Sequence, residues 1–175
     1  MKKGYEKYTP FKPIDIPDRQ WPNNVITKAP VWCSVDLRDG NQALVNPMGI
    51  ETKLAFFDLL VKIGFKEIEI GFPAASQIEY DFLRQLIERK MIPDDVTVQL
   101  LSQCREEQIE HTFESIRGCK QAIVHIYNST STLQREVVFH MSREEIKQIA
   151  IDGTRMVKER AKNFPGNLRL EYSPE

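Results

Sequence analysis

Between residues 31 and 172, short apolar runs alternate with longer segments in which apolar residues recur every three or four positions. The short runs are typical of buried strands and the longer segments of amphipathic helices. In chain order, the predicted strands and helices cover residues 31–35, 50–63, 67–71, 77–89, 96–101, 106–116, 121–127, 143–162 and 168–172. Strict alternation of this kind indicates parallel βα units, in which each helix returns the chain to the start of the next strand.

Two architectures fit this alternation. Five strands and four helices can form an open, doubly wound sheet, or they can form a little over half of a (β/α)8 TIM barrel, which typically needs about 250 residues. A complete domain seldom ends on a strand without its covering helix, so we expect the natural protein to continue beyond Glu175. Periodicity alone leaves both architectures open.

Helix ends carry their own signals. Gly64 directly follows the predicted helix 50–63 and is typical of a C-cap. Ser142 precedes the predicted helix 143–162, with Glu145 three residues later, which is the pattern of a capping box.

Composition limits the class of protein. The chain has 175 residues, 41% hydrophobic and 28% charged, which suits one soluble globular domain with a sizeable core. Its net charge is −1 and the signs are interleaved, which argues against nucleic acid and membrane surfaces as partners. We find neither a transmembrane run nor a secretory signal. Three widely spaced cysteines indicate a reduced, cytoplasmic chain.

Residues 1–30 differ from the rest of the chain. Prolines recur throughout this segment, which forbids a long helix and predicts an extended N-terminal arm, followed by the α/β part over residues 31–175. The arm also has aromatic residues that suggest packing against a surface of its own domain or of a partner subunit. These prolines and aromatics are Pro10, Pro13, Pro17, Pro22 and Pro30, with Tyr5, Tyr8, Phe11 and Trp21.

The first predicted strand leads into Asp36-Leu37-Arg38-Asp39-Gly40-Asn41-Gln42. The carboxyl ends of parallel strands are where such folds place their chemistry. Asp39 could bind a hard divalent cation, while Arg38 could neutralise a developing oxyanion. The structural alternative is an ion pair beside an ordinary Asp-Gly turn.

Other candidates lie on later strands. His125 sits in the apolar strand 121–127 and is followed by a polar run from Tyr127, although a lone histidine there is more often a core residue. Glu171 and Glu175 lie near the end of the last strand, where a solvent-facing turn is the plain alternative. Cys104 is a weak candidate nucleophile because no partner is visible.

The sequence has no Walker A, GxGxxG or His-x-His pattern. A single aspartate cannot hold a metal with useful affinity. If Asp39 is a metal ligand, we expect the remaining ligands to come from beyond residue 175 or from another chain.

Leu37-Arg38-Asp39-Gly40-Asn41-Gln42, followed by ten residues and Lys53, resembles the first signature of the α-isopropylmalate synthase and homocitrate synthase family. The pattern L-R-[DE]-G-x-Q-x₁₀-K fits at every specified position. The likeness to the longer members runs from about residue 7 to the end of the chain. It rests on residues 7–11, 18–22, 32–36, 71–77, 126–131 and 171–175.

This resemblance implies a TIM-barrel acyltransferase that condenses acetyl-CoA with 3-methyl-2-oxobutanoate and water, the committed step of leucine biosynthesis. It implies a divalent cation (Mg, Mn or Zn) on Asp39, with Arg38 beside the keto oxygen and Glu175 at the reacting centre. The keto-acid pocket would be lined by Gln42, His125, Tyr127 and Ser173. The complete protein would be a cytoplasmic homodimer.

The sequence departs from the family by ending early. The family's His-x-His metal pair, later strands, lid and leucine-sensing domain are missing, so we expect the 175-residue chain neither to bind metal tightly nor to turn over. Homocitrate and citramalate synthases, which share the signature, remain alternatives. So does a non-catalytic half-barrel that serves as an assembly module. A flavodoxin-like domain is a further option, but it requires a glycine-rich phosphate loop that Gly40 alone does not supply.

Overall fold

The computed structural model describes residues 3–9, 12, 14–20, 24 and 26–175. The backbone divides into two compact units, residues 1–30 and 31–175. In the first unit, Gly4–Lys7 forms a short 3-10 helix, η1. Phe11 and Trp21, on which the predicted packing of the arm partly depends, lie outside the described residues, so that packing remains a prediction.

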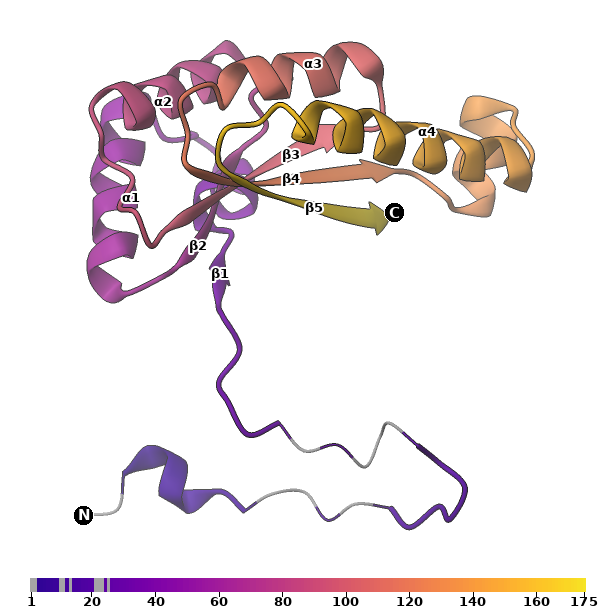
Figure 1. The fold of residues 1–175 in the computed structure, drawn as a ribbon, viewed down its shortest axis with the longest axis horizontal. Helices are drawn as coiled ribbons and strands as arrows, with labels where there is room; N and C mark the ends of the chain where they lie inside the picture. Colours follow the sequence, from indigo (N-terminus) through magenta and orange to yellow (C-terminus); the bar gives the residue numbers. More distant parts are fainter. Residues whose placement is uncertain (1–2, 10–11, 13, 21–23, 25) are drawn as a thin grey trace. The chain divides into compact units, whose positions relative to one another are not determined.

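The second unit follows the predicted alternation of strands and helices (Figure 1). In chain order it comprises β1 (Cys33–Ser34), α1 (Ile50–Ile63), β2 (Glu67–Gly71), α2 (Gln77–Glu88), β3 (Thr97–Gln103), α3 (Glu106–Ser115), β4 (Gln121–Asn128), α4 (Arg143–Ala161) and β5 (Asn167–Pro174). Two π-helical turns, η3 (Asp36–Gly40) and η4 (Gln134–Phe139), were not predicted.

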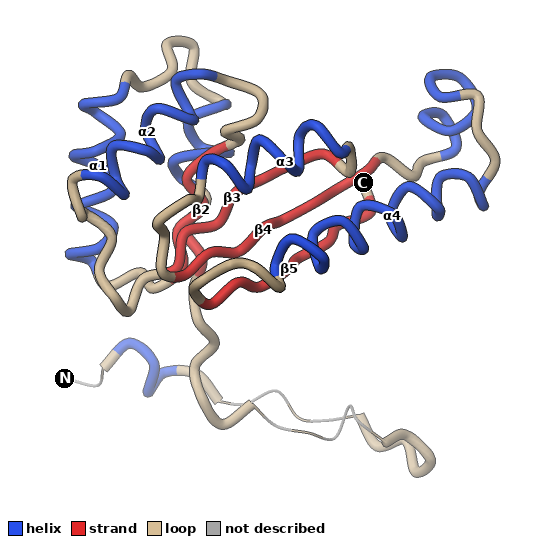
Figure 2. The backbone as a smooth tube through the Cα atoms, turned by 45° about the horizontal axis from the view of Figure 1, so that its top comes forward, coloured by secondary structure: helices blue, strands red, loops and turns tan. Residues whose placement is uncertain are grey.

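The order of the strands separates the two architectures. The sheet runs β1-β2-β3-β4-β5 with every neighbouring pair parallel. In a doubly wound sheet, the order in which strands are added reverses beside the first strand. In a barrel, each new strand is added next to the previous one. The helices all lie on one side of the sheet (Figure 2). The unit is therefore the beginning of a (β/α)8 barrel, and the open-sheet alternative is wrong.

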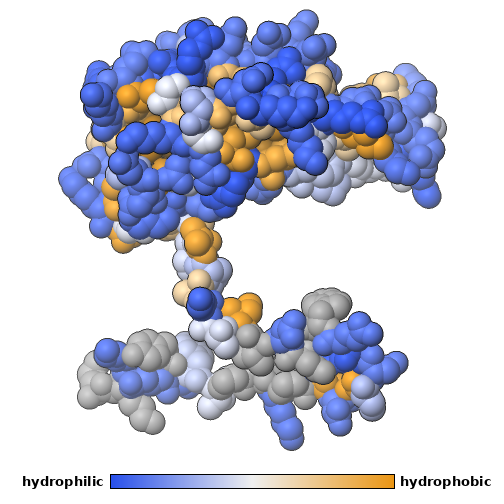
Figure 3. Space-filling model, viewed as in Figure 1, coloured by the Kyte–Doolittle hydropathy of each residue, from blue (hydrophilic) through white to orange (hydrophobic). Residues whose placement is uncertain are grey.

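The core lies between the sheet and its helices. Strand residues that point toward the helices are fully buried, and they pack against apolar residues of the helical layer. Burying one such side chain contributes about 1.5–3 kcal/mol. Hydrophilic residues cover most of the outer surface of the helices (Figure 3). The packed residues include Ile68, Ile70, Val98, Leu100, Val124 and Ile126 from the strands, with Phe57, Phe82, Ile109 and Val157 from the helices.

Alternate positions on the same strands are polar. Glu69, Gln99, His125 and Glu171 each stand directly next to an apolar residue that faces the helices. Because successive side chains of a strand point to opposite faces, these four belong to the interior face of the barrel. The interior face is where the predicted site residues of β4 and β5 also lie.

The first strand differs most from its prediction. Residues 31–35 were expected to form a buried strand, but only Cys33 and Ser34 pair with β2, and Trp32 is 71% exposed. The strand ends early because the carbonyl of Val35 accepts hydrogen bonds from the turn that follows it.

Both predicted helix-end signals are confirmed. Gly64 caps α1 with a φ of 111°, a conformation that costs glycine little. The Ser142 hydroxyl accepts from the backbone of Glu145, whose carboxylate accepts from the backbone of Ser142. Hydrogen bonds donated by the Ser142 backbone N–H and hydroxyl to the Glu145 carboxylate lower the pKa of Glu145.

No helix in the described part of the chain has the length and apolar character needed to cross a membrane.

Candidate active site

The turn η3 positions Arg38 and Asp39 at the carboxyl end of β1. The Val35 carbonyl accepts from the backbone N–H groups of Arg38, Asp39 and Gly40, at 3.3, 2.9 and 3.1 Å. Leu37 is fully buried and anchors the turn in the core. Arg38 donates from Nη1 to Asp39 Oδ1 at 3.1 Å and from Nη2 to Glu69 Oε2 at 3.0 Å. The turn thus directs the guanidinium toward β2.

Glu69 is a site residue that the sequence reasoning missed. Its side chain is only 1% exposed and its charge is balanced by the Arg38 guanidinium. Its other oxygen, Oε1, is buried without a hydrogen-bond partner among the described residues and lies 4.0 Å from His125 Nδ1. Glu69 therefore connects the predicted Arg38 region to the predicted His125 region.

His125 is surrounded by polar groups from both neighbouring strands. Its Nε2 atom is hydrogen-bonded to the Ser173 hydroxyl of β5. Its Nδ1 atom lies 3.3 Å from Gln99 Nε2 of β3. Glu171 Oε1 is 3.8 Å from Nε2. The structure thus brings together the predicted pair His125 and Ser173, and it adds Gln99, which the sequence reasoning missed.

Tyr127 lies on β4 two residues after His125. Its hydroxyl accepts from Gln103 Nε2 at 3.3 Å, and its ring meets Phe72 edge to face with centroids 6.4 Å apart. Gln42 is exposed and lines, with Arg38 and Phe72, a cavity of about 590 Å³. Both residues therefore lie near the carboxyl ends of the strands.

Glu175 joins this end of the sheet through its backbone. Its N–H donates to the Asn128 carbonyl at 3.0 Å, and its own carbonyl accepts from the backbone of Thr130. The residue is exposed. Its predicted place at the reacting centre remains a prediction.

Asp39 fits one ligand position of a divalent cation. Its carboxylate is 60% exposed and supplies a hard oxygen donor at the open end of the sheet. Among the described residues, however, no group of three histidine, cysteine, aspartate or glutamate side chains is arranged to hold a metal ion. The described residues therefore do not complete a metal site, and a metal-binding role for Asp39 stays a prediction.

The cysteines are poorly suited to nucleophilic chemistry. Burial raises the pKa of Cys104 to about 11. Burial, together with the charges of Glu69 and Glu67, raises the pKa of Cys33 to about 11. Burial also raises the pKa of Cys119. Because the thiolate is the nucleophile, a neutral thiol at Cys104 does not favour the nucleophile hypothesis.

We expect the folded chain to lose stability as the pH rises from 9.0 toward about 11. In the unfolded chain these thiols ionise near their ordinary pKa of 9.0, whereas the folded chain keeps them protonated, so alkali favours unfolding. The measurement is the thermal unfolding midpoint across this range. A Cys33→Ala/Cys104→Ala variant should show a shallower decline. If the midpoint of the variant falls as steeply as that of the unsubstituted chain, the loss of stability would come from lysine or tyrosine and not from the cysteines.

Comparison with known proteins places the chain in a family. The family model described as HMGL-like matches residues 29–175. Relatives from Helicobacter hepaticus (62% identical), Acetoanaerobium sticklandii (59%) and Rhodospirillum rubrum (58%) are each named 2-isopropylmalate synthase. The matches cover 97–98% of this chain but only 30–31% of each relative. On the extent of this match, the chain belongs to the HMGL-like family.

Proposed function

We propose that the chain is the first part of the catalytic barrel of a 2-isopropylmalate synthase, an acyltransferase that joins acetyl-CoA to 3-methyl-2-oxobutanoate. The observation that carries the proposal is the polar cluster on the interior face, where Arg38, His125 and Ser173 lie together with the buried Glu69. The names of relatives that are 55–62% identical support the same reaction.

The chemistry of the reaction explains why such a cluster is needed. A methyl proton of the acetyl group must be removed, and the resulting carbanion must add to the keto carbon. The keto oxygen then becomes an alkoxide, which a fixed cation stabilises most in a site that excludes water. Arg38 suits this role because Glu69 holds its Nη2 edge while the guanidinium remains beside the cavity that Gln42 also lines.

The remaining residues would bind and orient. We assign the keto acid to Gln42, His125, Tyr127 and Ser173, all near the carboxyl ends of the strands. Glu175 would position the substrates or relay a proton. When bound, a divalent cation (Mg, Mn or Zn) with Asp39 as one ligand would polarise the keto carbonyl. Its other ligands would come from outside these 175 residues.

We also infer the setting in which the whole protein works. Its partners would be the two small-molecule substrates, and it would act in the cytoplasm as a homodimer. The balanced charge of this part, with a net value of −1, supports a protein that does not bind nucleic acid or a membrane surface.

A chimera tests the proposed function. The 175 residues would replace the corresponding part of the Helicobacter hepaticus relative, and labelled acetyl-CoA would be offered with 3-methyl-2-oxobutanoate, pyruvate or 2-oxoglutarate. We expect label in 2-isopropylmalate and a kcat/KM at least about tenfold higher for 3-methyl-2-oxobutanoate than for the others.

The other outcomes are equally informative. A preference for pyruvate or 2-oxoglutarate would favour citramalate or homocitrate synthase instead. A folded chimera without turnover would favour the non-catalytic assembly module. The parent relative is the positive control. The isolated chain is the negative control, because its described residues do not complete a metal site.

A further inference from the structure

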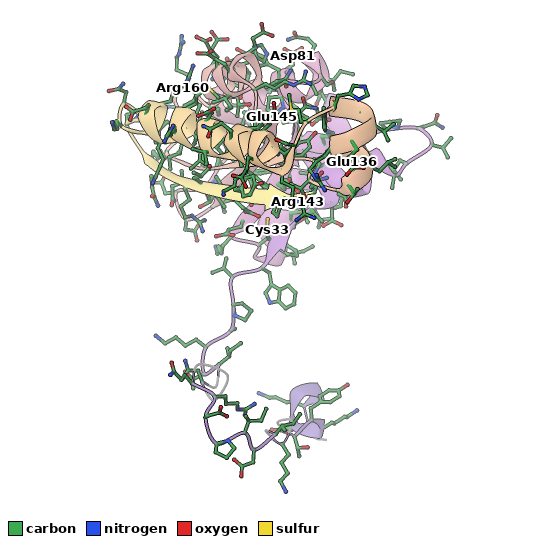
Figure 4. The ribbon with its side chains drawn as sticks, turned by 90° about the vertical axis from the view of Figure 1, so that its right-hand side faces the viewer. Cys33, Asp81, Glu136, Arg143, Glu145 and Arg160 are labelled. Carbon is green, nitrogen blue, oxygen red and sulfur yellow. The ribbon has the colours of Figure 1, made fainter. Side chains whose placement is uncertain are left out.

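We propose that Gln99 and Cys33 are positioning residues that fix the proton of His125 on Nε2 and so orient the hydroxyl of Ser173. The four side chains form a hydrogen-bonded series across the interior face, from β1 through β3 and β4 to β5. Figure 4 labels the starting point of the series, Cys33 of β1. The role in the reaction rests on the proposed function.

The series begins at the thiol of Cys33. Its sulfur lies 3.7 Å from Gln99 Oε1 and 3.8 Å from the carbonyl of Ser34, so both groups within reach of its proton are acceptors. The thiol retains that proton at neutral pH, since burial raises its pKa to about 11. A reversed Gln99 amide would place its NH₂ group against sulfur, which is only a weak acceptor. The thiol therefore favours the orientation with Oε1 toward Cys33.

This orientation directs the NH₂ group of Gln99 at His125. Gln99 is 6% exposed, and its Nε2 atom lies 3.3 Å from His125 Nδ1. An amide nitrogen only donates, so Nδ1 must accept and cannot carry a proton. In the neutral ring the proton is then on Nε2, from which it is donated to the Ser173 oxygen.

The neighbouring carboxylates do not overturn this assignment. Glu69 Oε1 and Glu171 Oε1 lie 4.0 and 3.8 Å from the ring nitrogens, beyond hydrogen-bond distance. Glu69 Oε1 has no hydrogen-bond partner among the described residues, as expected if Nδ1 has no proton to give it. A doubly protonated ring would also set an N–H group against the Gln99 NH₂ group.

The consequence lies at Ser173. Its oxygen accepts from His125, which leaves its own O–H free to donate toward a substrate. A hydroxyl donor matches the carbonyl or carboxylate oxygens of a keto acid. The reverse tautomer would consume the Ser173 proton at His125 Nε2 and leave only acceptor lone pairs facing those oxygens.

The tautomer can be measured without any ligand. The whole 175-residue chain would be labelled with ¹⁵N-histidine, and the ring nitrogens assigned by NMR at neutral pH. The chain has three histidines, so a His111→Asn/His140→Asn variant, measured beside the unsubstituted chain, identifies the His125 signals. We expect a proton on Nε2 and none on Nδ1. A proton on Nδ1, alone or together with Nε2, would overturn the proposal.

Substitutions test the cause. Gln99→Glu replaces the donor with an acceptor and should move the proton to Nδ1. Gln148→Glu, the same change at an exposed position of α4, should not. Gln99→Met removes the donor without adding charge, and it should raise the minor tautomer about fivefold. Cys33→Ala should raise the population of the minor tautomer less than Gln99→Met does. Cys33→Ser should return that population to its value in the unsubstituted chain.

An unchanged tautomer in both Gln99→Glu and Gln99→Met would contradict the positioning role of Gln99. Because no substrate is present, this failure is distinct from a failure of the proposed reaction. The reaction could fail in the chimera while the tautomer is as described, and the reverse is equally possible.

Discussion

Glu69→Gln is expected to lower the free energy of unfolding by about 3 kcal/mol, since it removes a buried charge from an ion pair and leaves the other charge behind. The Glu69 side chain is 1% exposed and that of Arg38 is 22% exposed, so water replaces little of the lost attraction. Urea unfolding of the chain and of the variant, followed by circular dichroism, gives the difference. The slope of the transition should stay unchanged.

Asp39 provides the matched control, because it forms the other ion pair of the same guanidinium. Its carboxylate is 60% exposed, and Asp39→Asn should cost less than about 1 kcal/mol. Arg38→Met/Glu69→Met, which removes both charges, should recover part of the loss. Equal losses in Asp39→Asn and Glu69→Gln would show that burial of Glu69 does not matter.

Glu79→Gln is expected to cost about 4 kcal/mol, because it leaves the ammonium of Lys53 without a countercharge. Lys53 is fully buried, and its Nζ is paired with Glu79 and lies 5.2 Å from the centre of the Phe82 ring. Glu79 also packs over Gly71, where an added Cβ would clash with its carboxylate. Chemical denaturation of the chain and the variant measures the loss.

The control for this second pair is Asp58→Asn. Asp58 and Lys62 form an exposed pair on α1, 50% and 71% accessible, which should contribute less than about 0.5 kcal/mol. Lys53→Met/Glu79→Gln, which removes the buried charge, should be more stable than Glu79→Gln alone. A double variant that is no better would mean that the ion pair is not the cause.

Lys53 is a signature residue whose side chain is fully buried. The family pattern ends on this lysine, yet the structure buries it between α1 and α2. Its partner Glu79 lines the cavity that also contains Arg38 and Gln42. The lysine thus stabilises one wall of that cavity from within the core.

Much of the fold could be predicted from the sequence, because burying one face of a strand or helix fixes the spacing of its apolar residues. Where a helix covers a strand, every second strand residue must be apolar, and β2, β3 and β4 were predicted within two residues at each end. The short β1 was overestimated because Val31 and Trp32 are apolar yet exposed, 62% and 71%. Apolar residues without a covering helix carry no such constraint.

The site was predicted less completely, for a related reason. Motif reading selects residues in unusual loops, such as Arg38 and Asp39, and overlooks polar residues inside regular strands. Glu69 and Gln99 alternate with apolar neighbours in the same phase as His125. The polar residues at these alternate positions on successive strands mark the interior face. Which atoms then meet depends on the register of pairing, which a single sequence does not contain.

We propose that Arg38 stabilises the charge that develops on the keto oxygen. The most direct measurement is kcat of the chimera with 3-methyl-2-oxobutanoate when Arg38→Gln is introduced, compared with Arg89→Gln on the outer surface, where the side chain is 52% exposed. We predict that Arg38→Gln lowers kcat by about 10²–10³-fold. Arg89→Gln should stay within about twofold of the parent. Comparable, small effects of the two substitutions in folded chimeras would mean that Arg38 does not stabilise the charge on the keto oxygen.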